Sequence, residues 1–386
     1  MNDNITPYVR YIGADDKDLD LFESQYVVPQ GISYNSYVIT DEKIAVMDTI
    51  DQRKTEEWTV RLEEALEGRT PDYLIVQHME PDHAANIGWF AEKYPEATIV
   101  ASAKAIQMMP QFFEEVNFAG RTQTVKEGDT LCLGQHTLKF IMAPMVHWPE
   151  VMLTYEESEK ILFSADAFGK FGALCHEGEW IDEARRYYFN IVGKYGAQVQ
   201  ALLKKAAGLD IAMICPLHGP VLKENLGYYI GLYDTWSKYE PETEGVVVAY
   251  ASIHGNTAAA ARRMAEILSE KGAAEVMLID LCRDDMALAV ESAFRYSKMI
   301  VAASSYDAGV FPPMFDFLHH LQIKNFQKRR VGIIENGSWA PTAGRMMSCM
   351  LSEMKNMEIM EHMVTIKSSM KKADLLQMEQ GCSGKG

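Results

Sequence analysis

The 386-residue sequence has no long uninterrupted apolar run, although 48% of its residues are hydrophobic. A membrane-spanning helix needs about 20 consecutive apolar residues, so we expect no membrane anchor. The first residues, Met1-Asn2-Asp3-Asn4, also lack the basic and apolar regions of a secretory signal. Both absences predict a cytoplasmic protein.

Cysteine is scarce and scattered along the chain. The six cysteines contain no C-x-x-C pair, which excludes a small iron or zinc module built on paired cysteines within this sequence. Several of them lie within apolar runs, where a buried, reduced thiol is common. This usage is typical of a reducing compartment such as the cytoplasm.

Basic residues are outnumbered by acidic ones. Lys and Arg together number 37 against 54 Asp and Glu, which leaves a net charge of −17. Because a phosphate backbone is repelled by such a surface, we expect no nucleic-acid partner. The charge favours a docking partner that carries a basic patch.

One segment, Lys238–Gly245, has the charge and the proline of an interdomain linker. A chain of this length is too long for one ordinary core, so two domains are expected. The linker predicts that they span residues 1–240 and 245–386.

The first domain alternates short apolar runs with turns and a few helices, which indicates sheets covered by helices. Its predicted strands are 44–47, 73–77, 98–101, 137–143, 152–155 and 160–163, and its predicted helices are 58–67, 84–93 and 188–205.

The second domain has a cleaner alternation of strand and helix, which predicts a doubly wound parallel sheet. Its predicted strands are 245–250, 275–280, 298–303, 330–335 and, less regularly, 358–364, and its predicted helices are 257–271, 284–294, 314–321, 346–355 and 371–379.

Four metal-binding side chains gather in six residues directly after the apolar run 73–77: His78, Glu80, Asp82 and His83. A buried strand that ends in such a loop delivers its side chains to the edge of the sheet, where α/β proteins bind ligands. The two carboxylates would repel each other in one tight loop unless a cation lay between them.

Three further candidate ligands, His147, Asp166 and His218, each follow an apolar run of their own. A single histidine is more often structural than metal-binding. Here, however, four metal-binding side chains occur together within residues 78–83, which favours metal binding. Seven nitrogen and oxygen ligands exceed the needs of one tetrahedral zinc ion. The set predicts two adjacent metal ions.

The first strand of the second domain ends in a loop of hydroxyl, amide and small side chains, directly before a helix. Backbone amides at a helix N-terminus bind anions, so this loop predicts a phosphate site. The alternative is an ordinary capped helix. The candidate residues are Ser252, Ile253, His254, Gly255, Asn256 and Thr257.

Two later strand-end loops are suited to a heterocycle, on whose faces Tyr306 and Trp339 would stack. Two ordinary polar turns are the alternative. The residues concerned are Ser304, Ser305, Tyr306, Asp307 and Gly309 in the first loop, and Asn336, Gly337, Ser338, Trp339 and Ala340 in the second.

The ligand motif resembles that of the metallo-β-lactamase superfamily, H-x-H-x-D-H followed by distant His, Asp and His. Glu80 stands where the hydrolases carry a second histidine, and the resulting H-x-E-x-D-H looks like the flavodiiron proteins. Three carboxylates suit non-haem iron better than a zinc hydrolase site. The resemblance implies a metallo-β-lactamase-like αββα sandwich followed by a flavodoxin-like sheet.

The same resemblance implies a role for each ligand and a bound FMN. One iron ion would take His78, Glu80 and His147, the other Asp82, His83 and His218, and Asp166 would bridge them. The three loops of the second domain resemble those that hold FMN in flavodoxin. The chain departs at Ser304, a usual proline position, and at Ser305, a usual threonine that keeps its hydroxyl.

The implied activity is reduction of dioxygen to water, of nitric oxide to nitrous oxide, or both. Electrons would enter through FMN from an external donor such as rubredoxin, and family resemblance implies a head-to-tail homodimer, possibly a dimer of dimers. We expect Tyr195 and His176 near the metals, with Tyr34 a further candidate. The alternatives are a zinc-dependent hydrolase fused to a flavodoxin-like domain and a non-enzymatic electron carrier.

Overall fold

The computed structural model describes residues 4–176 and 178–381. It divides into two compact units, Met1–Tyr188 with Ala197–Asp234, and Phe189–Gly196 with Thr235–Gly386. Among the described residues, no helix is long and apolar enough to cross a membrane.

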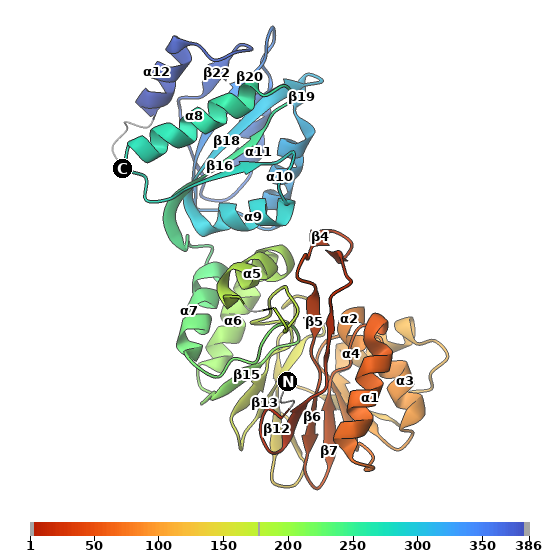
Figure 1. Ribbon diagram of the computed structural model, residues 1–386. Coiled ribbons are helices and arrows are strands. Elements are labelled where there is room, and N and C mark those ends of the chain that lie inside the picture. Colours follow the sequence, from red (N-terminus) through yellow and green to blue (C-terminus); the bar gives the residue numbers. More distant parts are fainter. Residues whose placement is uncertain (1–3, 177, 382–386) are drawn as a thin grey trace. The chain divides into compact units, whose positions relative to one another are not determined.

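The first unit is built on two sheets with the core between them (Figure 1). The six-stranded sheet runs in the order β1 (Val9–Tyr11), β6 (Tyr37–Thr40), β7 (Ile44–Met47), β8 (Tyr73–Val76), β9 (Thr98–Ser102), β10 (Thr122–Val125). The five-stranded sheet runs β11 (Thr130–Cys132), β12 (Thr137–Met142), β13 (Met152–Glu156), β14 (Ile161–Phe163), β15 (Met213–Cys215). Ile75 and Val100 of the first sheet pack with Phe140 and Phe163 of the second.

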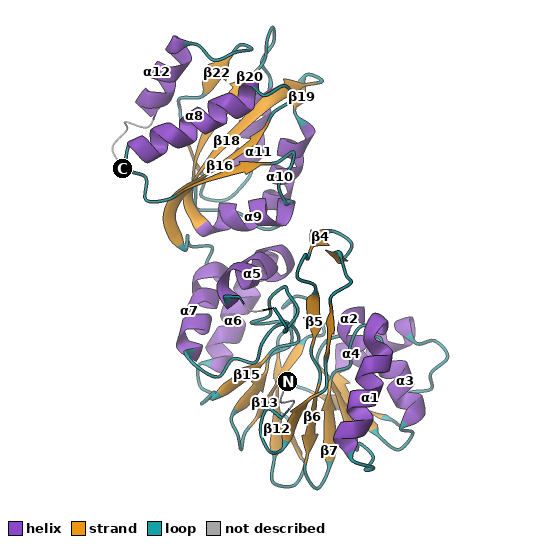
Figure 2. Ribbon diagram, viewed as in Figure 1, coloured by secondary structure: helices purple, strands orange, loops and turns teal. Residues whose placement is uncertain are grey.

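Helices cover the outer faces of this sandwich, as Figure 2 shows. The six-stranded sheet is flanked by α1 (Thr55–Leu66), α2 (Pro81–Ala84), α3 (Ile87–Lys93) and α4 (Ala103–Phe112), and the five-stranded sheet by α5 (Trp180–Tyr187), α6 (Gly196–Ala206) and α7 (Leu226–Ser237). Short pairs β2 (Ala14–Asp16) with β5 (Ile32–Tyr34) and β3 (Leu21–Phe22) with β4 (Tyr26–Val27) complete the unit.

Strand direction explains why distant ligands meet. In the five-stranded sheet, β12 and β14 both run antiparallel to β13, and β15 runs parallel to β14. The three strands β12, β14 and β15 therefore point the same way. His147, Asp166 and His218 follow their carboxyl ends and are carried to one edge.

The second unit is a parallel sheet in the order β17-β16-β18-β20, followed by β21 and β22, which both pair with β20. This is the strand order 2-1-3-4-5 of a flavodoxin-like sheet. Its strands are β16 (Thr243–Ala251), β17 (Val276–Asp280), β18 (Tyr296–Tyr306), β20 (Arg330–Asn336), β21 (Glu358–Ile359) and β22 (Val364–Ile366), and the short β19 (Gly309–Val310) pairs antiparallel with the end of β18. Helices α8 (Asn256–Glu270) and α12 (Lys372–Gly381) cover one face, and α9 (Met286–Arg295), α10 (Pro312–Ile323) and α11 (Ala343–Ser352) the other.

Three predicted elements differ in the structure. The expected helix 188–205 is interrupted, because π-helical Tyr188–Val192 and 3-10 Gly193–Tyr195 precede α6. Its first part packs with the second unit, where Phe189 stacks on Phe294 with ring centroids 4.3 Å apart. The predicted helix 84–93 is divided into α2 and α3, and the strand 358–364 into β21 and β22.

Candidate functional site

The seven predicted ligands form two neighbouring groups in the first unit. One contains His78, Glu80, His147 and Asp166, and the other contains Asp82, His83 and His218; within each group the ligand atoms lie within 4.8 Å of one another. Six of the seven side chains are buried and Glu80 is half-buried. Side chains up to 140 positions apart in the sequence therefore converge.

Asp166 connects the two groups. Its Oδ1 lies 3.1 Å from Nε2 of His83, and its Oδ2 lies 3.2 Å from Nε2 of His147 and 3.3 Å from Nε2 of His78. Each carboxylate oxygen thus faces a different group. This is the arrangement that a bridging ligand requires.

The donor atoms fit a pair of bound cations better than a hydrogen-bonded core. Both oxygens of Asp82, both ring nitrogens of His83 and Nε2 of His218 are buried without a hydrogen-bond partner among the described residues. Orphaned polar atoms are costly in a folded protein. Yet Nε2 of His218 lies 3.2 Å from Oδ2 of Asp82, and two ligands about 2.1 Å from one metal at a right angle lie about 3 Å apart.

Buried acceptors orient two of the imidazoles. Nδ1 of His78 lies 2.8 Å from Oε1 of Glu150, and Nδ1 of His218 lies 2.7 Å from the carbonyl oxygen of Ser33. Donation to these acceptors assigns the proton to Nδ1 and leaves Nε2 facing the centre. Sequence reasoning missed Glu150, although a carboxylate three residues after His147 in the same loop was a usable signal.

Other buried contacts hold the ligand loops. Asp48 accepts hydrogen bonds from the backbone and side-chain nitrogens of Gln77, at 2.7 and 2.8 Å, directly before His78. Nδ2 of Asn35 donates to the carbonyl oxygens of Pro216 and Gly219, both at 2.8 Å, on either side of His218. The loops are therefore fixed by the folded chain itself.

Opposite charges shift the ionisation of the cluster in the metal-free chain. Burial lowers the pKa of His147, but the carboxylates of Asp166 and Glu80 outweigh it and raise that pKa to about 9. Burial raises the pKa of Asp166, but the nearby imidazoles outweigh it and hold that pKa well below its usual range. A bound cation would therefore compete with protons on the imidazoles.

Aromatic rings border the second group. Phe22 and Tyr187 lie 5.5 Å from the ring of His218, and Tyr34 lies 6.1 Å from it, measured between ring centroids. Tyr187 is buried, and burial followed by the nearby carboxylates raises its pKa well above the usual range. The sequence offered no signal that separates Tyr187 from its tyrosine neighbours.

Neither of the two predicted catalytic residues has a described hydrogen bond or ring contact with a metal ligand, and their catalytic role stays a prediction. Tyr195 is half-buried in the 3-10 turn that packs with the second unit, and Nζ of Lys194 lies 5.8 Å from its ring centroid. His176 is exposed in a loop, where its backbone nitrogen donates to the carbonyl oxygen of Ala173. The structure brings two tyrosines beside His218: Tyr187, which was not predicted, and Tyr34, the further candidate named from the sequence.

The second unit has a cavity of about 550 Å³ at the carboxyl ends of β16, β18 and β20. Every predicted cofactor residue except Gly255 and Gly309 lines it: Ser252, Ile253, His254, Asn256, Thr257, Ser304, Ser305, Tyr306, Asp307, Asn336, Gly337, Ser338, Trp339 and Ala340. The two glycines shape the loops, since Gly255 has a φ of 89° directly before α8.

The geometry of this cavity suits a phosphate and a flat ring. The loop 252–257 places the amide end of α8 at the cavity, and Oγ1 of Thr257 lies 2.8 Å from Oγ of Ser304. Trp339 is 92% exposed and Tyr306 is 45% exposed, so both rings are free to cover a ligand.

Sequence reasoning missed Thr342 and Ser368, which also line this cavity. Ser368 exchanges hydrogen bonds with Asn336, at 2.8 and 3.1 Å. It follows β22, the parallel neighbour of β20. The other cofactor loops were predicted because each directly follows a predicted strand. The same reasoning would have included Ser368 if the last strand had been predicted at Val364–Ile366.

We predict that Glu150→Gln lowers the metal affinity of the chain by about 10- to 100-fold, because the uncharged acceptor makes His78 a poorer ligand. Competition with a coloured chelator for ferrous or zinc ions measures this. Glu156→Gln is the matched control, since Glu156 is also buried but, among the described residues, accepts hydrogen bonds only from the backbone of Ser158 and Glu159. Equal affinities in both variants would contradict the prediction.

We also predict a pH-dependent stability of the metal-free chain. The pKa of His147 is raised from 6.5 to about 9 on folding, so its contribution is complete below pH 6.5 and is lost as the pH rises through about 9. We expect this contribution to be on the order of 1 to 3 kcal/mol. It is measured as the difference in unfolding free energy between the native chain and His147→Asn at several pH values; a constant difference would refute it.

Comparison with known proteins places this arrangement in a family. A family model described as the ODP family beta lactamase matches residues 32–219. An uncharacterized protein of Methanocaldococcus jannaschii is 31% identical over 81% of this chain and 80% of its own length. The anaerobic nitric oxide reductase flavorubredoxin of Aliivibrio salmonicida is 30% identical over 88% of this chain and 70% of its own length.

Solved structures agree over nearly the whole chain. The rubredoxin:oxygen oxidoreductase of Desulfovibrio gigas superposes with a TM-score of 0.92 and 25% identity, covering 98% of this chain and 96% of that one. The flavodiiron protein of Giardia intestinalis has the same fold, with a TM-score of 0.91 at 24% identity over 99% of this chain and 95% of that one. With its H-x-E-x-D-H loop and its two-sheet sandwich unit followed by a parallel-sheet unit, the chain belongs to the flavodiiron protein family.

Proposed function

We propose that the chain is an oxidoreductase that reduces dioxygen to water, nitric oxide to nitrous oxide, or both, at two iron ions, with FMN delivering the electrons. The observation that carries this is Asp166, whose two oxygens face two separate groups of buried ligands. Relatives named for nitric oxide reduction and for oxygen reduction support the same chemistry.

Each of the two groups of ligands would bind one of the two iron ions. His78, Glu80 and His147 would hold one iron, Asp82, His83 and His218 the other, and Asp166 both. Three carboxylates and four imidazoles make an anionic donor set, which favours iron over a zinc hydrolase centre. Bound together, the diiron pair and the flavin supply the electrons for a multi-electron reduction.

The protein residues around the centre orient the ligands and exclude water. Glu150 keeps a proton on Nδ1 of His78, so that Nε2 is available as a ligand. Phe22, Tyr34 and Tyr187 make an aromatic wall beside His218, which limits the entry of water. A small uncharged gas molecule is the kind of substrate that such a wall admits.

In the second unit, the loop 252–257 and the start of α8 would hold the FMN phosphate. Tyr306 and Trp339 would cover the flavin ring. Neither role needs a basic side chain, since backbone amides at a helix N-terminus attract an anion by themselves.

Electrons would come from an external redox protein. Rubredoxin is our specific proposal, supported by the name of the D. gigas structure. We also propose a head-to-tail homodimer, possibly paired into a dimer of dimers, in which FMN of one subunit serves the irons of the other. The scattered cysteines support a cytoplasmic location.

The decisive experiment is metal and flavin analysis followed by anaerobic mixing of the reduced protein with each gas. We expect two irons and one FMN per chain, and reoxidation of both cofactors by dioxygen, nitric oxide or both. Zinc without iron would favour the hydrolase, and a chain with FMN but no metal would favour the electron carrier. Either result would refute the proposal.

Glu80→His tests why the site selects iron. The change restores the ligand motif of the hydrolases and removes a negative charge, so we predict a lower ratio of bound iron to bound zinc. Elemental analysis after loading with equal amounts of both metals measures it. Glu63→His on the surface of α1 is the control, and an unchanged ratio in Glu80→His would rule out this account of selectivity.

A further inference from the structure

The first unit contains an apolar cavity of about 90 Å³ between α6, α7 and the five-stranded sheet. Leu153, Leu162 and Ile214 of β13, β14 and β15 form its floor, with helix side chains opposite. None of its lining residues is charged. The hydroxyl of Tyr233 is engaged, because it accepts a hydrogen bond from the backbone nitrogen of Phe168 at 2.6 Å.

The inner end of this cavity adjoins the ligand loops. Val146 precedes His147 in the chain, and Ala167 follows Asp166. Both Val146 and Ala167 line the cavity and are buried. The cavity therefore approaches two ligands, one of which is the carboxylate shared by both groups.

The outer end of the cavity approaches the protein surface at the end of α6. Ala207, which lines it, is exposed, and its neighbours Leu203, Ala206 and Ile211 are half-buried. The lining thus passes from surface residues to buried residues beside the metal ligands. It is apolar along this whole length.

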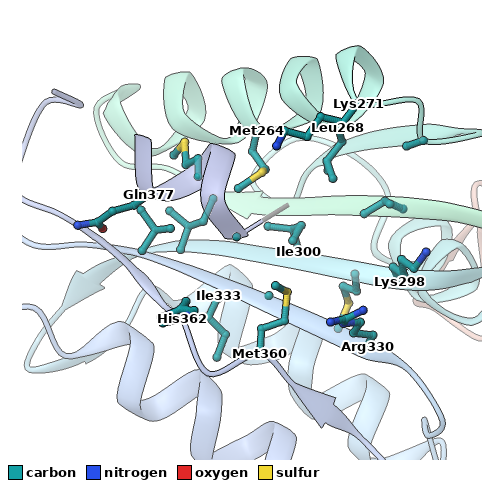
Figure 3. Close-up of a pocket in the computed structure, with 18 of the residues that line it drawn as sticks. Met264, Leu268, Lys271, Lys298, Ile300, Arg330, Ile333, Met360, His362 and Gln377 are labelled. Atoms are coloured by element: carbon teal, nitrogen blue, oxygen red, sulfur yellow. The ribbon is translucent and has the colours of Figure 1, made fainter. Parts of the chain in front are cut away.

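The chemistry of the lining selects the occupant. A buried water molecule needs two to four polar partners, whereas an apolar cavity stays dry and binds small apolar molecules. A different cavity, of about 330 Å³ in the second unit, makes the contrast. Figure 3 shows Lys271, Lys298 and Arg330 at its border, and these side chains favour water and anions. The cavity under α6 has no such groups.

We propose that this cavity binds small apolar gas molecules and is a route by which they reach the metal centre. The proposal rests on the proposed function, because dioxygen and nitric oxide are the substrates it would admit. Ions and larger polar molecules would be excluded by the apolar lining. Gas would enter at the end of α6 and reach the ligands past Val146 and Ala167.

Xenon is the probe, since it binds dry apolar cavities without needing a metal or a flavin. We expect crystals of the holoenzyme under xenon pressure to show xenon among Leu162, Leu202 and Ile214. Ala206→Phe should fill the cavity and remove this xenon. Ala201→Phe is the matched control, because Ala201 lies on the same helix but is exposed and does not line the cavity.

The rate of reaction with gas then tests the route. At limiting gas, we expect the bimolecular rate of reoxidation to fall severalfold in Ala206→Phe and to stay unchanged in Ala201→Phe, with equal turnover at saturating gas. Leu203→Trp replaces Ala206→Phe if that variant does not fold. Absence of xenon from the native cavity, or loss of xenon with an unchanged rate, would overturn the proposal.

Failure of the proposed function gives a different result. In that case xenon would still bind in the native protein and in Ala201→Phe, but no form would react with either gas. The cavity would then remain a gas-binding site, and the reductase assignment would be wrong.

Discussion

The attraction between one buried carboxylate and the imidazoles around it organises the first unit. Asp166 is in the interior, where an isolated charge is very costly. Its two oxygens lie 3.1 to 3.3 Å from three different histidines, so it connects two groups of ligands. Removing it would leave each group with excess positive charge or unpaired nitrogens. The two groups of ligands therefore form one site because Asp166 lies between them.

Both units place their chemistry at the carboxyl ends of strands, for the same topological reason. In the first unit, β12, β14 and β15 share a direction and carry His147, Asp166 and His218. In the second, parallel strands bring three polar loops to a cavity of about 550 Å³. The two sites differ, however, in how buried the residues around them are. Buried acceptors such as Glu150 fix the metal ligands, whereas exposed rings such as Trp339 border the flavin cavity.

Prediction from sequence succeeded where the evidence was local. The apolar run before His78 indicated β8, and the alternation after residue 245 indicated the parallel sheet. The predicted helix 188–205 begins as an α-helix only at Gly196; the π and 3-10 turns before it contain Phe189, which stacks on Phe294, about one hundred positions away. Among the short strands of the first forty residues, a strand was anticipated only within residues 31–37. Asn35, which holds the His218 loop by two hydrogen bonds, lies directly after one of them.

The sequence by itself determined which atoms can bind metal, that a carboxylate replaces one histidine of the hydrolase motif, and that each ligand follows a strand. These properties depend on side-chain chemistry and on periodicity over a few residues. Only the tertiary structure decided which ligands share a group, that Asp166 faces both groups, and that Glu150 and Tyr187 lie beside them. Such distances join residues separated by tens to more than a hundred positions. They are set by how sheets and helices pack, and no local pattern encodes them.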